Sequence, residues 1–378
     1  MAPVMLALYA MIFLRLLKVV NTRGTVPAPE KTQRRVQSLD IPIAVLALLA
    51  TTSFAFSIYK HDSFYALLRL FAYIGLYYVI MNEFDHRMRK RVIWVAISVG
   101  SGLSLYGLLQ YFGVFDKSWW YPPQFLAATY VNHNHFAGYL ELVIPVALSI
   151  AVRRKSEDIV YGLCLAAAIV VMSAALLLTQ SRGAWISLGA SIAIMLMAML
   201  RSEMSLAKKS LVVACLLLAV LALLYFSQDV VTTRLETLSG VSSGEDVSGG
   251  RLKIWQGAMG MIKARPLLGV GISNFDSGFY RYRPTGLNVR VVYAHNDYLQ
   301  AATEMGLVAP VFMVWIFALT VSAGLKKDAG PYAFGCATGV LSLAIHGLVD
   351  FNFHITANMI VFVIWIAITM GESCDQRA

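Results

Sequence analysis

The sequence has few charged residues and few cysteines, and each shortage excludes a class of protein. Only 14% of its 378 residues are charged, whereas a soluble globular chain carries about 25%. The chain therefore has too little charge to cover a water-facing surface. None of its four cysteines lies in the longest polar segment, between about residues 227 and 298. A disulfide framework is thereby excluded there, and no cysteine–histidine spacing is typical of a zinc site.

Long apolar runs make up most of the remaining sequence. Hydrophobic residues form 58% of the chain, and its mean hydropathy is +0.66. We expect an all-α, polytopic membrane bundle of about eleven helices, each able to cross a hydrocarbon core of roughly 30 Å. The predicted spans lie near residues 3–20, 41–59, 63–81, 92–112, 135–152, 159–179, 183–200, 208–226, 299–324, 331–349 and 356–372. We take the first run as a span and not a signal peptide, because its basic residues stand at its far end.

Basic residues concentrate in alternate connections between the predicted spans. The set comprises Arg23, Lys31, Arg34, Arg35, Arg87, Arg89, Lys90, Arg91, Arg153, Arg154, Lys155, Arg201, Lys208, Lys209, Lys326 and Lys327. The positive-inside rule places these connections and the C-terminus in the cytoplasm. This explains the net charge of +10 without a nucleic-acid partner. An odd number of spans then leaves the N-terminus outside, which suggests a missing or miscounted first helix.

Hydropathy divides the chain into three parts. Residues 1–226 hold about eight transmembrane helices, residues 227–298 form one large periplasmic segment, and residues 299–378 hold about three more helices and a short cytoplasmic tail. A segment that long without a role is uncommon. No internal repeat is visible, so an inverted-repeat transporter gains no support.

The large segment contains a predicted linker and a predicted amphipathic helix. Val241–Gly250 has the composition of a flexible linker. A helix is expected near residues 251–265, and Pro266 ends it. Its apolar stripe consists of Leu252, Trp255, Met259 and Ile262. Such a helix should lie on the membrane surface or across the mouth of the bundle.

Three short motifs place a cationic or titratable side chain where a helix is expected to begin. They are Ser181-Arg182-Gly183, Gly249-Gly250-Arg251-Leu252 and Ala294-His295-Asn296-Asp297. Free backbone N–H groups and the positive end of the helix dipole favour an anion at such positions. Arginine binds phosphate oxygens in pairs, and histidine accepts protons near neutral pH. The motifs therefore predict a site on the outer face for a lipid-linked pyrophosphate, with a base beside it.

The chain has no Asp-x-Asp pair, the element with which many glycosyltransferases hold a metal against a diphosphate. In the predicted site Arg182 and Arg251 would replace that metal, and His295 would accept the proton of an incoming hydroxyl. Each residue also has an ordinary explanation. Arg182 fits an interfacial anchor, Arg251 a solvated charge at the head of a surface helix, and His295 a loop residue before a helix cap. Their occurrence together on one face favours the shared site.

Longer motifs around these residues resemble a known family. In order along the chain stand Gln180-Ser181-Arg182-Gly183-Ala184-Trp185, Gly250-Arg251-Leu252-x-x-Trp255, Pro266-Leu267-Leu268-Gly269-Val270-Gly271, and His295-Asn296-Asp297-Tyr298-Leu299-Gln300 followed by Glu304-x-Gly306. From about Asn132 onward the chain resembles the bacterial O-antigen ligase and O-antigen polymerase superfamily. The resemblance implies an inner-membrane protein of about a dozen helices, which raises the expected number to 11–12.

The resemblance also implies an activity. Members of the superfamily are inverting glycosyltransferases that act in the periplasm, without a metal or other cofactor, on glycans linked to undecaprenyl pyrophosphate. Arg182 and Arg251 resemble the family's pyrophosphate-binding arginines, and His295 resembles its catalytic histidine. The favoured acceptor is the lipid A-core, as in O-antigen ligation. A second lipid-linked repeat unit, as in polymerisation, and a protein hydroxyl remain alternatives.

A transporter of the same lipid is an alternative from a different class. It would need charged groups in the middle of the membrane, and Arg69 is the main residue of that kind. A structural scaffold is a third alternative, and it would not need the arginines at all.

Several further residues are candidates for accessory roles. Asn132 and Asn134 could bind sugar hydroxyls or cap a helix, and Asn296 could cap the helix after His295. Glu304 could orient His295 or Arg251. Arg281, Arg283 and Arg290 could steer an anionic donor or contact lipid headgroups. His346, Asp350 and His354 could belong to the site or form a structural His–Asp pair.

Overall fold

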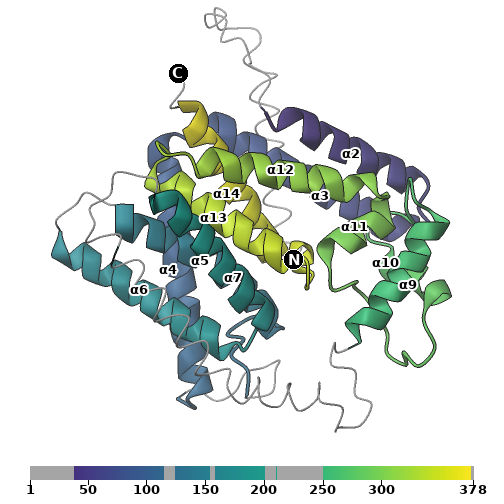
Figure 1. The fold of residues 1–378 in the computed structure, drawn as a ribbon, viewed down its shortest axis with the longest axis horizontal. Helices are drawn as coiled ribbons and strands as arrows, with labels where there is room; N and C mark the ends of the chain where they lie inside the picture. The colour runs from purple at the N-terminus through teal and green to yellow at the C-terminus, as the bar shows by residue number, and fades with distance from the viewer. Residues whose placement is uncertain (1–37, 115–123, 154–157, 201–209, 211–249, 376–378) are drawn as a thin grey trace, which may run out of the picture.

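The structure, a computed structural model, describes residues 38–114, 124–153, 158–200, 210 and 250–375 (Figure 1). The spans predicted near residues 3–20 and 208–226 lie outside the described residues, apart from Ser210. The predicted linker Val241–Gly250 also lies outside them, except for its last residue.

The described residues form helices and no strand, which confirms the all-α fold class. The helices are α2 (Asp40–Ala55), α3 (Lys60–Glu83), α4 (His86–Tyr111), α5 (His133–Arg153), α6 (Ile159–Leu178), α7 (Arg182–Leu200), α9 (Arg251–Ala264), α10 (Phe275–Phe279), η1 (Tyr280–Tyr282), α11 (Asp297–Met305), α12 (Val308–Gly324), α13 (Pro331–His346), η2 (Asn352–His354) and α14 (Thr356–Asp375).

Side chains that accept hydrogen bonds from backbone N–H groups define the starts of several helices. Asp85 accepts from Met88 N at the start of α4, and Asp158 accepts from Tyr161 N at the start of α6. Such caps satisfy donors that the first helical turn leaves free. Pro331 opens α13, where its fixed φ suits a helix and its missing N–H costs nothing.

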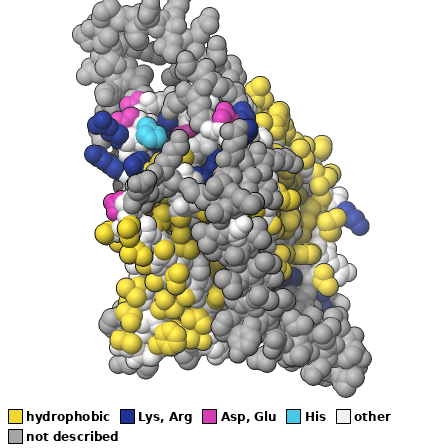
Figure 2. Space-filling view, turned by 60° about the vertical axis from the view of Figure 1, so that its left-hand side comes forward, with side chains coloured by type: hydrophobic (Ala, Val, Ile, Leu, Met, Phe, Trp, Pro, Cys, Tyr) yellow, Lys and Arg dark blue, Asp and Glu magenta, His cyan; other side chains and the backbone are white. Residues whose placement is uncertain are grey.

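Six helices of the described residues are long and apolar enough to span a membrane: α3, α4, α5, α6, α7 and α14. Helices α2 and α12 are shorter and also apolar. In Figure 2, hydrophobic side chains cover a broad area of one face, with charged side chains gathered above it. Exposed Val95 and Leu105 of α4, and exposed Ile159 and Val170 of α6, suit contact with lipid tails. The chain is therefore a polytopic membrane bundle, and its total number of spans stays a prediction.

Helices α5 and α13 form the centre of the bundle. Helix α13 packs against α5, α7, α12 and α14 (Figure 1). Along α5 almost every side chain from His135 to Ile150 is buried. From α14, the indole of Trp365 donates a hydrogen bond to Leu142 O of α5 at 2.9 Å. This core fixes the ends of α5 and α13 relative to each other.

The span predicted over residues 299–324 is wrong, because the chain breaks there into α11 and α12. The break is at Gly306, whose φ is +90°. A Cβ at this position would lie 2.0 Å from Leu267 O, so only glycine fits. Leu307 N donates a hydrogen bond to Pro266 O at 2.9 Å and so ties the break to the segment before α11. Helix α11 is consequently a short helix at the end of the bundle.

The segment from α9 to residue 294 has a hydrophobic core of its own, formed by side chains that include Ile254, Ala258, Met261, Phe275 and Phe279. The predicted stripe of α9 is divided in the structure, since Ile262 is buried while Leu252 and Met259 are exposed. The packed face is displaced because Gly257 admits the Phe279 ring, which lies 2.5 Å from where a Cβ would stand.

The short basic connections and the predicted site residues lie at opposite ends of the bundle. At one end Arg153 Nη1 donates to Ala329 O at 2.8 Å, and His86 lies 3.8 Å from Glu372. The described basic connections predicted to be cytoplasmic meet at this end. At the other end Tyr59 N donates to Asn274 Oδ1 at 2.8 Å, and the starts of α5, α7 and α11 lie there. The predicted site residues therefore lie opposite the basic connections.

Candidate active site

His295 stands two residues before the start of α11, in a strained backbone conformation. Its φ is +50°, a region that residues with a side chain seldom adopt. The preceding residue, Ala294, is held on both sides: its N–H donates to Gln300 Oε1 at 2.9 Å, and its carbonyl accepts from the Trp255 indole at 3.0 Å. Asn296 then caps α11 by accepting from Leu299 N at 2.9 Å. The surroundings of His295 therefore impose its conformation.

A buried carboxylate faces the imidazole of His295. Nδ1 of His295 lies 3.8 Å from Oδ1 of Asp350, and the two side chains are 36% and 2% exposed. The same carboxylate accepts from Phe351 N at 2.8 Å. Burial opposes ionisation of Asp350, but His295, His346 and the Phe351 amide favour its charged form and lower its pKa to about 2. An ionised group behind Nδ1 leaves Nε2 of His295 as the atom that can accept a proton.

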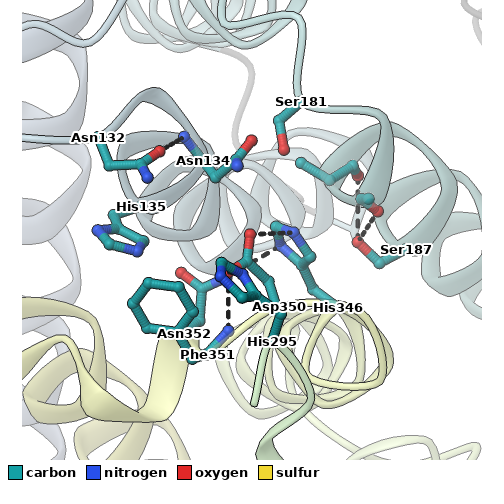
Figure 3. A network of polar contacts seen from close by, with 12 residues as sticks. Asn132, Asn134, His135, Ser181, Ser187, His295, His346, Asp350, Phe351 and Asn352 are labelled. Carbon is teal, nitrogen blue, oxygen red and sulfur yellow. Dashed lines mark hydrogen bonds and ion pairs between the residues drawn. The ribbon is translucent and has the colours of Figure 1, made fainter. Parts of the chain in front are cut away.

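Behind Asp350 a chain of buried polar groups joins α13, α5 and α7 (Figure 3). His346 Nε2 lies 3.8 Å from Asp350, and His346 Nδ1 lies 3.1 Å from Glu141 Oε2. Glu141 Oε1 in turn accepts from the Ser187 hydroxyl at 2.6 Å. Polar groups this deep in an apolar bundle need partners, and these supply one another. This series of contacts fixes the position of Asp350 within the bundle.

The start of α7 meets this network directly. A Cβ added to Gly183 would lie 2.7 Å from His346 Nε2, so the missing side chain lets α7 approach the imidazole. Ser181 N donates to the Thr179 hydroxyl at 3.3 Å. Arg182 is the first residue of α7, and its side chain is exposed. Arg182 thus directly precedes Gly183, the residue that packs against His346.

Arg251 is the first residue of α9 and follows Gly250, whose φ is +81°. Its side chain is half-buried. Trp255 stands one helical turn later on the same face, and its indole binds Ala294, the neighbour of His295. Helix α9 is thereby attached next to His295.

The start of α5 forms another wall of the site. Asn132 Oδ1 accepts from Asn134 N at 2.8 Å, so Asn132 caps this helix. The side chain of Asn134 is half-buried and makes no hydrogen bond with the residues that the structure describes. Figure 3 shows Asn134 between Asn132 and Ser181, on the side of the network that α5 and α7 share. Its amide is available to a ligand.

Other predicted accessory residues lie in different contacts. The Glu304 carboxylate accepts from Ser273 N at 2.7 Å and from the Gln300 amide at 3.0 Å, so it reaches His295 only through Gln300. Arg290 pairs with Asp276, and Arg283 donates to Val289 O. Arg281 is exposed on η1. His354 lies 3.0 Å from Asp297 and not beside Asp350. Arg281 and Arg290 thus lie on the surface of the segment from α9 to residue 294, and Arg283 is half-buried in it.

Three residues of the site were given no role from the sequence: Glu141, Ser187 and Gln300. Glu141 carried a usable signal, because it is a lone carboxylate within the apolar run from 135 to 152, and such residues usually have a specific partner. Serine and glutamine carried no comparable signal. Their roles follow from contacts between segments far apart in the chain, such as Ser187 with Glu141.

A protein-family model describing O-antigen ligases matches residues 167–314 of this chain. The matched range includes Arg182, Arg251 and His295. The resemblance to the O-antigen ligase superfamily is thus confirmed. No curated protein matches the chain. The match indicates a glycosyltransferase activity of the O-antigen ligase or polymerase type, on a lipid-linked glycan and an acceptor.

Proposed function

We propose that this protein is a metal-independent, inverting glycosyltransferase that moves a glycan from undecaprenyl pyrophosphate to an acceptor hydroxyl. O-antigen ligation to the lipid A-core is the favoured reaction. The observation that supports this best is the strained His295, exposed on one side and facing buried Asp350 on the other. A histidine so oriented is suited to take a proton from a hydroxyl group.

In the proposed reaction the acceptor hydroxyl gives its proton to Nε2 of His295. The oxygen attacks the anomeric carbon and forms the new glycosidic bond. The bond from that carbon to the pyrophosphate oxygen breaks on the opposite face, so the configuration inverts. The bonding electrons leave with the pyrophosphate, whose negative charge increases. Asp350 stabilises the imidazolium that forms.

The departing pyrophosphate is assigned to Arg182 and Arg251. Each is the first residue of a helix, where free N–H groups and the helix dipole also favour an anion. The guanidinium fork matches two phosphate oxygens at once and stays charged at all relevant pH values. Asn134, whose amide has no partner among the described residues, would bind a sugar hydroxyl of the donor or acceptor.

The proposed location is the bacterial inner membrane, with the site facing the periplasm. The site lies at the end of the bundle opposite Arg153 and the Lys326–Lys327 connection. The positive-inside rule places such basic connections in the cytoplasm. Undecaprenyl-linked donor and lipid A-core would then both reach the site from the outer leaflet.

The test is reconstitution of the full chain with an undecaprenyl-pyrophosphate glycan and purified lipid A-core, in the presence of EDTA. We expect glycosylated lipid A-core from the wild type and none from His295→Ala, with equal amounts of inserted protein. His61→Ala is a matched control, because His61 is exposed and contacts Asp62 and Tyr65, which are not residues of the proposed site. Transfer by His295→Ala, or loss of activity with EDTA, would contradict the proposal. Longer lipid-linked glycans in place of the lipid A product would identify a polymerase.

A further inference from the structure

A cavity of about 230 Å³ lies beside the candidate active site, between α2, α3, α11, α12 and α14. Away from its polar end, the lining is almost entirely aliphatic and aromatic. It includes Tyr73 and Tyr77 of α3 and Phe362 and Ile366 of α14. Packed protein interiors contain few voids larger than a water molecule, and an apolar cavity of about 150 Å³ is enough to bind benzene. The cavity therefore has room for hydrocarbon.

One end of this cavity is polar and is lined by two carboxylates and one guanidinium group. Both carboxylates there have partners: Asp297 accepts from Phe353 N and lies 3.0 Å from His354 Nδ1. Glu304 accepts from Ser273 N and Gln300. Arg69 also lines the cavity. The structure gives Arg69 no hydrogen bond or ion pair with any described residue.

An unpaired guanidinium in an apolar helix requires a counter-charge. Arg69 stands more than two turns inside α3, among Leu68, Leu70 and Phe71. Ionisable groups at such positions are costly and are retained where they meet an anion or a polar pathway. A free phosphate ion would satisfy the charge but would leave the apolar part of the cavity unexplained. A neutral lipid would fill the apolar part but leave Arg69 without a partner.

The cavity is separated from His295 by a wall of aromatic rings. Tyr293 stacks on Phe351 with ring centroids 4.3 Å apart. Phe351 meets His295 edge-on at 4.9 Å on one side, while Tyr293 contacts His354 at 5.1 Å on the other. A ligand in the cavity thus lies next to the catalytic group without touching it.

We propose that this cavity binds an anionic lipid, with its phosphate against Arg69 and a hydrocarbon chain between α3, α12 and α14. Ser273, at the same end of the cavity, has an exposed side chain that can donate a hydrogen bond to the phosphate. The inference does not depend on the transfer reaction. A membrane phospholipid and a polyprenyl phosphate share the required chemistry, and the experiment separates them.

The test is photo-crosslinking of the full chain in phosphatidylcholine nanodiscs. The probes are phosphatidylglycerol and phosphatidylcholine that carry the same diazirine-labelled acyl chain. In the wild type the anionic probe should label peptides of α3, α12 and α14 about tenfold more than the neutral probe, because charge-assisted bonds are the strong ones. Arg69→Gln should abolish that preference, and Arg69→Lys should retain part of it.

Two further variants separate local from general effects. Arg265→Gln removes an exposed arginine from the outer segment and should change nothing. Met313→Trp fills the cavity from α12 and should reduce labelling by both probes. Competition with unlabelled undecaprenyl phosphate or phosphatidylglycerol identifies the natural occupant, since the tighter competitor is the lipid that the cavity prefers. Equal labelling by both probes, or unchanged labelling in Arg69→Gln, would overturn the proposal.

Discussion

The carboxylate of Asp350 faces two imidazoles, and it keeps its charge over the pH range of an assay. Burial would raise the pKa of Asp350, but His295, His346 and the Phe351 amide outweigh it and bring the pKa to about 2. A lowered carboxyl pKa means that the charged form persists as the pH falls, until the pH approaches that value. Asp350 is therefore ionised throughout the range in which the enzyme would be assayed.

Transfer activity should consequently fall on the acid side with a midpoint well above pH 2, because a group other than Asp350 becomes protonated. Asp350→Asn should lower the rate about 10²- to 10⁴-fold across that range, since the imidazole loses the charge that orients and stabilises it. Rates measured from pH 4 to 9 for both proteins check this. An acid limb near pH 2, or a variant as active as the wild type, would remove Asp350 from its positioning role.

Arg251 is predicted to act through the shape of its guanidinium as well as through its charge. Arg251→Lys should therefore lose activity nearly as severely as Arg251→Ala, by about 10- to 100-fold. Initial rates at several donor concentrations measure the loss. Arg265→Lys, at an exposed position in the same segment, is the control. Full activity of Arg251→Lys would show that a point charge suffices and that paired binding of phosphate oxygens is not required.

At the scale of helices, α7 and α13 approach each other closely in the site. Gly183 has room for no Cβ, since one would lie 2.7 Å from His346 Nε2 and 3.1 Å from Val349. Gly189, two turns further along α7, has nothing within 4 Å of the same point. The pair distinguishes a packing requirement from the general helix propensity of alanine.

Gly183→Ala should displace His346, disturb Asp350 and reduce transfer strongly, with a packing cost of about 1–3 kcal/mol. Gly189→Ala should leave activity unchanged and stabilise α7 slightly, because alanine favours helix over glycine by about 1 kcal/mol. Thermal unfolding in detergent and transfer rates measure the two effects. Equal behaviour of the two variants would show that the contact between Gly183 and His346 has no role in catalysis.

The sequence predicted most helices but not where each helix breaks or what it faces. Apolar runs located α2 to α7 and α14, because lipid-exposed helices need continuous apolar surface. Hydropathy also predicted α11 and α12 as one helix, because it does not detect the positive φ at Gly306. The apolar periodicity predicted the wrong buried face of α9 in part, because the contact of Phe279 with Gly257 decides which face is packed. His295 and Asp350 were visible as polar residues in an apolar chain, whereas the contacts that hold them join segments distant in sequence. Asn358, for example, donates to His135 O across 223 positions.

At the scale of the whole molecule, the position of the short basic connections predicts its orientation. In a variant without native cysteines, Thr285→Cys lies on the exposed surface of the outer segment and should react with a membrane-impermeant maleimide in intact cells. Lys326→Cys lies at the opposite end and should react only after the membrane is opened. Gel-shift labelling with and without permeabilisation reads both positions. The reverse pattern would place His295 in the cytoplasm and exclude a periplasmic transfer reaction.

The indole of Trp255 sits on the carbonyl that precedes His295, while Gln300 holds the amide of the same residue. A small aromatic compound that displaced this indole would change the orientation of the His295 imidazole. Such a compound would not need to resemble a sugar or a diphosphate. Inhibitors of this type would work regardless of which glycan a bacterial strain exports.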